Sequence, residues 1–76
     1  MKARLISNPK ITGDTSTFNV TSLSEVIMYF DDGSADSMFP SDIEILINQE
    51  WIPLDIAFKD ELVEISDDNT MFYERK

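Results

Sequence analysis

Short stretches of this chain alternate between apolar and polar residues, and turn-forming residues recur about every ten positions. Successive side chains of a β-strand point to opposite faces, so spacing two is typical of strands and not of helices. The clearest example is residues 43–47, where three isoleucines share one face. The pattern predicts a mostly β fold with strands at 3–7, 17–23, 26–30, 35–39, 43–47, 51–58, 62–66 and 70–74.

A hairpin in the middle of the chain is the strongest local prediction. Val26–Phe30 is a run of five apolar residues, which is typical of a strand that is buried on both faces. The sequence Asp-Asp-Gly-Ser follows at 31–34, where glycine supplies a positive φ and aspartate tolerates left-handed geometry. We therefore expect the chain to reverse there and to return as a strand over 35–39.

The three prolines mark breaks between the expected strands. Pro9 lies in an expected loop over 8–14, because proline cannot donate a ladder hydrogen bond. Pro40 ends the strand before it, and residues 40–42 are expected to form one 3₁₀ turn. Pro53 would not be tolerated in a central strand, which places the extended segment around it at a sheet edge.

The C-terminal part of the chain predicts a second hairpin. Residues 62–66 and 70–74 have strand character and flank Asp67-Asp68-Asn69, whose side chains favour turns. A short helix over 58–65 is the competing interpretation, because Phe58, Leu62 and Ile65 lie at helical spacing.

The sequence YFDDG at 29–33, followed by MFPSDIEIL at 38–46, resembles the central hairpin and final turn of Tudor-like and Src-homology-three-like small barrels. The resemblance covers residues 26–46. It implies a small antiparallel barrel of about five strands, to which the second hairpin adds a C-terminal extension. Short bacterial and prophage proteins with this kind of barrel are similar in outline.

Tudor-like domains bind methylated lysine or arginine in an aromatic cage, because ring faces attract a quaternary ammonium. Such a cage draws an aromatic residue from the first loop, whereas residues 7–17 contain none. Packing of the rings in the core is therefore the favoured interpretation. The aromatic residues left in the matching region are Phe18, Tyr29, Phe30 and Phe39.

The composition removes several classes of chemistry. The chain has no cysteine and no histidine, which excludes a disulfide framework, a thiolate zinc site and a Ser-His-Asp triad built from this chain alone. The spacing Asp31-Asp32-x-x-x-Asp36 lacks the order of a calcium-binding loop. No apolar run is long enough for a membrane span. We expect a cytoplasmic protein that is not an enzyme and carries no cofactor and no metal.

The net charge is −9, from six Lys and Arg against 15 Asp and Glu. Phosphate binding needs clustered bases, so direct binding to nucleic acid or to an anionic membrane is not expected. The most plausible partner is another protein with a basic surface. Residues 11–58 contain no basic residue and nine acidic ones, namely Asp14, Glu25, Asp31, Asp32, Asp36, Asp42, Glu44, Glu50 and Asp55.

These features predict a non-catalytic protein-interaction or accessory module. Tryptophan is favoured at binding hot spots, so an edge patch around Trp51 is one candidate site, although packing of this ring in the core is the favoured alternative. The candidate binding residues are Trp51, Ile52 and Leu54 at the edge, with Tyr29 and Phe39 on the barrel. A second hypothesis is an acidic inhibitor that imitates nucleic acid through Asp31, Asp32, Asp36, Asp42 and Glu44.

Overall fold

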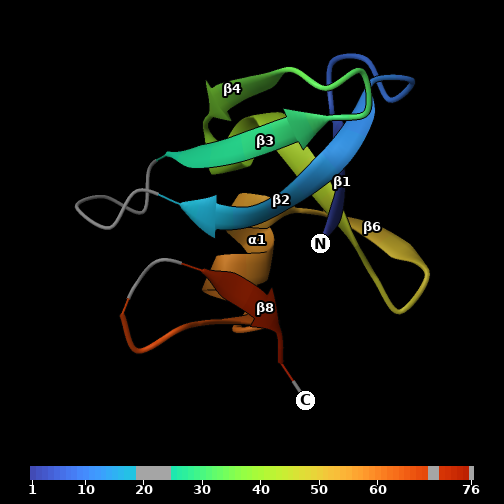
Figure 1. The fold of residues 1–76 in the computed structure, drawn as a ribbon. Coiled ribbons are helices and arrows are strands. Elements are labelled where there is room, and N and C mark those ends of the chain that lie inside the picture. Colours follow the sequence, from blue (N-terminus) through green and yellow to red (C-terminus); the bar gives the residue numbers. More distant parts are fainter. Residues whose placement is uncertain (19–24, 69–70, 76) are drawn as a thin grey trace.

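The computed structural model describes residues 1–18, 25–68 and 71–75 (Figure 1). The elements are β1 (Lys2–Leu5), β2 (Thr12–Phe18), β3 (Val26–Phe30), β4 (Ala35–Met38), the 3₁₀ helix η1 (Pro40–Asp42), β5 (Ile43–Ile47), β6 (Glu50–Pro53), α1 (Leu54–Lys59), β7 (Val63–Ile65) and β8 (Phe72–Glu74).

The described residues form two antiparallel sheets, and the predicted mostly β class is confirmed. One sheet has six strands in the order β4-β3-β2-β1-β5-β6, and the other is the hairpin β7-β8. The central hairpin, the 3₁₀ turn, the strand β5 and the C-terminal hairpin all form where they are expected. The 3₁₀ helix η1 places β5 next to β1, and the two strands pair with Leu5 opposite Ile43.

The large sheet is not closed into a five-stranded barrel, and this part of the prediction is wrong. A closed barrel would need β5 to pair with β4 on its free side. That side of β5 pairs instead with β6, which returns through a tight turn at Asn48 and Gln49, both with positive φ. In the described part of the chain, β4 and β6 therefore remain the two edges of an open, curled sheet.

Strand β3 has the predicted bounds but is not buried on both faces. Val26 and Met28 are fully buried, whereas Ile27 is 39% exposed and Tyr29 is 46% exposed. The alternation arises because only one face of the sheet is covered by other elements. An unbroken apolar run at this position therefore produces an apolar outer surface.

The extended segment predicted over 51–58 is confirmed to Pro53, where it forms part of β6, but its continuation to Phe58 is wrong because this part is helical. The alternative helix over 58–65 is wrong as well, because α1 ends at Lys59 and residues 63–65 form β7. Pro53 itself ends β6 at the predicted sheet edge and precedes the first residue of α1. Proline is confined to edge strands because it has no N–H to donate to a ladder. Leu54 and Ala57, three residues apart, place one face of α1 in the core.

Strand β2 begins earlier than expected and includes Gly13 and Asp14, which were predicted to lie in a loop. Its register against β3 shifts between Asp14 and Thr17. At this irregularity Thr15 is fully buried, and its hydroxyl donates a hydrogen bond of 2.8 Å to the Ile27 carbonyl oxygen. The remainder of the strand predicted over 17–23 lies outside the described residues.

The core lies between the inner face of the large sheet and the layer formed by α1 and the β7-β8 hairpin. Figure 1 shows α1 and β8 on the same side of β2. Phe72 on β8 contacts Phe58 edge to face, with ring centroids 5.5 Å apart. Among the described residues, the buried apolar ones are Ala3, Val26, Met28, Ile43, Ile45, Ile47, Leu54, Ala57, Val63 and Phe72.

Candidate functional site

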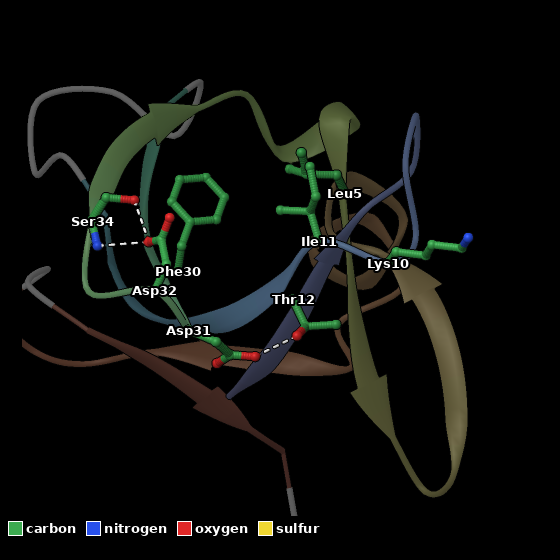
Figure 2. A pocket seen from close by; sticks show the side chains of 8 residues that line it. All are labelled: Leu5, Lys10, Ile11, Thr12, Phe30, Asp31, Asp32 and Ser34. Atoms are coloured by element: carbon green, nitrogen blue, oxygen red, sulfur yellow. Dashed lines mark hydrogen bonds between the residues drawn. The ribbon is translucent and has the colours of Figure 1, made fainter.

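A groove of about 580 Å³ opens between the loop after β1 and the turn after β3. Figure 2 shows Leu5 and Ile11 on one side of the groove and Phe30 on the other. Leu5 and Phe30 are half-buried and pack against the core, so each side of the groove has one residue that is held in place by core contacts. The lining residues are Leu5, Lys10, Ile11, Thr12, Phe30, Asp31, Asp32 and Ser34.

The first wall is set by the short loop around Pro9. The Ile11 amide donates a hydrogen bond of 2.9 Å to the Asn8 carbonyl oxygen, and the Leu5 amide donates one of 3.1 Å to the Ile11 carbonyl oxygen. These bonds hold Ile11 beside Leu5 although the Ile11 side chain is 39% exposed. The loop thus presents an apolar surface to solvent.

The second wall is set by the turn of the central hairpin. Gly33 has φ +94°, and its amide donates a hydrogen bond of 3.0 Å to the Phe30 carbonyl oxygen. Asp32 Oδ1 accepts hydrogen bonds from the Ser34 hydroxyl, at 2.6 Å, and from the Ser34 amide, at 2.9 Å. These two bonds lower the pKa of Asp32, the hydroxyl having the larger effect, so its carboxylate is ionised at neutral pH.

Two hydrogen bonds tie this turn to β2. The Asp31 amide donates to the Thr12 carbonyl oxygen at 3.1 Å, and the Thr12 hydroxyl donates to Asp31 Oδ2. Figure 2 shows the Asp31 and Asp32 carboxylates on the Phe30 side of the groove. The turn is therefore a braced element that carries two fixed carboxylates.

Neither Asp31 nor Asp32 has a cationic partner in the described residues. Figure 2 shows Lys10 directed away from both of them. The ion pairs of the described residues lie elsewhere and join the N-terminal amine to Asp14, Arg4 to Glu44, and Arg75 to Glu61 and Glu64. The groove thus combines apolar walls with two unpaired negative charges, which suits a ligand with an apolar body and a cationic end.

The predicted binding patch around Trp51 is only partly exposed to solvent. Trp51 and Ile52 are half-buried on the edge strand β6, and Ile52 packs against the core. Leu54 is fully buried at the start of α1, so its assignment as a binding residue is corrected: it is a core residue. The guanidinium carbon of Arg4 lies 4.1 Å from the Trp51 ring centroid, and Arg4 Nε donates a hydrogen bond of 2.8 Å to Glu44.

Truncation of Arg4 should expose Trp51. Because the guanidinium lies over the ring, Arg4→Ala is expected to shift the tryptophan emission to longer wavelength and to increase its quenching by acrylamide. Lys2→Ala, on the same strand, serves as the control and should leave both unchanged. An Arg4→Ala spectrum identical to that of the wild type would contradict the stacking of Arg4 on Trp51.

The two aromatic candidates of the central hairpin lie outside the groove. Tyr29 is on the outer face of β3, and Phe39, directly after β4, is 61% exposed. Neighbouring residues of a strand point to opposite faces, so Tyr29 and Phe30 cannot line one cage. The Phe18 side chain lies outside the described residues.

The five acidic candidates lie on four different elements. Asp31 and Asp32 line the groove, whereas Asp36 lies on β4 and Asp42 in η1. Glu44 on β5 is paired with Arg4. An imitation of the phosphate backbone remains a prediction, and no particular feature of the structure favours it.

Sequence reasoning missed one wall of the groove, which consists of Leu5 and Ile11. A signal was present in the sequence: Ile11 is an isolated apolar residue in a polar stretch between Pro9 and Gly13. Within residues 1–18, 25–68 and 71–75 no three acidic side chains gather as metal ligands, and none of the helices there is long and apolar enough to cross a membrane.

Comparisons with known proteins found no matching family model, no matching curated protein and no matching solved structure.

Proposed function

We propose that this protein is a non-catalytic interaction module that binds a basic segment of another protein in the groove. The observation that carries the proposal is the pairing of apolar walls, Leu5, Ile11 and Phe30, with two carboxylates that have no cationic partner among the described residues. An apolar residue of the partner would fill the groove, and a neighbouring Lys or Arg would meet Asp31 and Asp32.

The net charge supports a basic partner over the other classes of ligand. At −9 the protein repels nucleic acid and anionic membranes, while it accelerates encounter with a positively charged protein. The cytoplasm is the proposed compartment, because the chain has no cysteine for disulfide bonds. A relationship to Tudor-like or Src-homology-three-like domains is a further part of the proposal, supported by the position of β5 beside β1 and by η1.

Selection from a random twelve-residue peptide library against the immobilised protein tests the proposal. We expect enriched peptides to carry Lys or Arg next to a large apolar residue. Asp31→Asn with Asp32→Asn should weaken an enriched peptide about tenfold, since two charge-assisted contacts are lost. Asparagine retains the oxygen that accepts from Thr12 or Ser34, so the turn is preserved.

The matched control is Glu50→Gln with Asp60→Asn, which removes the same charge at two exposed positions that do not line the groove. It should leave the affinity within about twofold, because exposed charges outside a contact have small effects. Enrichment of peptides without basic residues, or equal losses in the two double variants, would contradict the proposal.

A further inference from the structure

A second hollow, of about 460 Å³, lies on the outer face of β3 and β4. Its lining residues are Glu25, Ile27, Ala35, Asp36 and Ser37. It adjoins the groove along the chain, because Ser34 lines the groove and Ala35 follows directly. The strand that joins the two hollows is β4, an edge of the large sheet.

The open side of β4 carries backbone groups that can pair with another strand. The Phe30 amide donates a hydrogen bond of 2.8 Å to the Ser34 carbonyl oxygen. In an antiparallel ladder, bonded and non-bonded pairs alternate, so Ala35, opposite Tyr29, and Ser37 turn their N–H and C=O groups away from β3. Both residues therefore present these groups at the sheet edge.

One backbone group of this edge, the Ser37 N–H, is bonded to an exposed side chain that can rotate away. The Ser37 amide donates a hydrogen bond of 2.8 Å to the carboxylate of Asp36, and among the described residues it donates none to a backbone carbonyl. Asp36 is exposed and forms no ion pair in the described residues. An incoming strand would supply a carbonyl to Ser37, and the released carboxylate would be free to meet a cation.

The apolar side chains beside this edge are uncovered. Ile27, Tyr29 and Phe39 are 39%, 46% and 61% exposed. Strand alternation places Ala35, Ser37 and the following Phe39 on the same outer face as Ile27 and Tyr29. A partner strand at the edge would cover part of this apolar surface.

The charges at the edge select the partner. Glu25, Asp32 and Asp36 border β4 without a basic residue among them, so the β4 edges of two copies would bring like charges together. A second copy of this chain is therefore disfavoured. An extended segment that alternates apolar and basic residues fits, because its apolar side chains face Ile27 while its cations lie on the side of Asp36.

We infer that the open edge of β4 binds an extended basic segment of the partner as an added strand, continuous with the segment in the groove. This inference rests on the proposed function and deepens it, because it specifies how the bound chain runs. Backbone pairing would supply affinity, and alternate side chains would supply selectivity.

The test uses the peptide acetyl-Lys-Val-Lys-Val-Lys-Val-amide at low salt and two N-methylated forms, one methylated at the three valines and one at the three lysines. In either strand direction, one of these two sets of N–H groups faces β4. We expect one methylated peptide to bind at least about tenfold more weakly than the parent, because the two hydrogen bonds to the Ala35 and Ser37 carbonyl oxygens are lost, while the other retains its affinity.

Amide chemical shifts of the isotope-labelled protein locate the bound peptide. Supporting results are shifts at Ala35 and Ser37 together with the unequal effect of methylation. Ile27→Ser should weaken the parent peptide about fivefold through lost apolar contact. Ile56→Ser is the matched control, at 43% exposure on α1, and should not weaken it.

Two other outcomes separate the inference from the proposed function. Shifts confined to Leu5, Ile11 and Phe30, with equal binding of both methylated peptides, would overturn strand addition and leave the groove as the binding site. The absence of shifts at both the groove and β4 would overturn both proposals.

Discussion

Gly13→Ala is expected to abolish or nearly abolish folding. A Cβ atom at this position would collide with the Tyr29 carbonyl oxygen and would lie 2.9 Å from the Phe30 Cα. Both obstacles belong to the backbone of β3, which cannot move without breaking its pairing with β2 and β4. Overpacking costs up to about 3 kcal/mol even against side chains that can shift, so we expect at least that loss here.

Thermal unfolding followed by far-ultraviolet circular dichroism measures this loss. A domain of this size loses about 4–8 °C of melting temperature per kcal/mol, so the variant should melt at least about 12 °C lower or be unfolded at 25 °C. The control is Gly33→Ala. Gly33 has φ +94° but open space around it, so only strain of about 1–2 kcal/mol is expected. A Gly13→Ala protein that melts near the wild type would contradict the close approach of β2 and β3.

The same glycine illustrates what the sequence can and cannot predict. Gly13 beside Asp14 has the local composition of a turn, which predicts a loop there. Its real role depends on how closely β3 approaches, which is a tertiary contact between residues far apart in the chain. By contrast, the turn at 31–34 depends on residues within one hairpin, and local composition is sufficient to predict it.

Two further differences have the same origin. The part of the predicted extended segment after Pro53 is the helix α1, because burial of Leu54 and Ala57 under the sheet stabilises a helix that is too short to show clear periodicity. The apolar run 26–30 indicates a strand correctly, but it cannot show that only one face is covered. Coverage depends on where α1 and β8 pack.

The groove contains both kinds of feature, those that local sequence predicts and those that depend on tertiary contacts. Asp31 and Asp32 could be singled out from the sequence, because turn chemistry places them at a hairpin tip. Leu5 and Ile11 could not be assigned to the opposite wall, because their position depends on the pairing of β1 with β2 and on the hydrogen bonds of the loop around Pro9. Sequence patterns therefore predict one wall of the site, whereas tertiary pairing brings the two walls together.

Phe72→Ala is expected to cause the second large loss of stability, about 3–5 kcal/mol. Phe72 is 1% exposed and is among the largest fully buried side chains. It lies on β8, outside the large sheet, and contacts Phe58 of α1 edge to face. Truncation would leave a cavity where the C-terminal hairpin meets α1 and the sheet, and this small core has few other contacts to compensate.

Urea unfolding, followed by circular dichroism and by Trp51 fluorescence, tests this prediction. The two signals also show whether the loss of stability extends to the large sheet. Phe72 shares one core with Met28 and Ile43 of the large sheet. The fluorescence of Trp51, which lies on the edge strand β6, and the circular dichroism signal should therefore report the same urea midpoint, and this midpoint should be lower than that of the wild type. Tyr73→Ala is the matched control: Tyr73 is the next residue on β8 and 48% exposed, and the change should cost less than about 1 kcal/mol. A Phe72→Ala protein in which Trp51 keeps the wild-type midpoint would show that the β7-β8 hairpin is an independent appendage rather than part of the cooperative core.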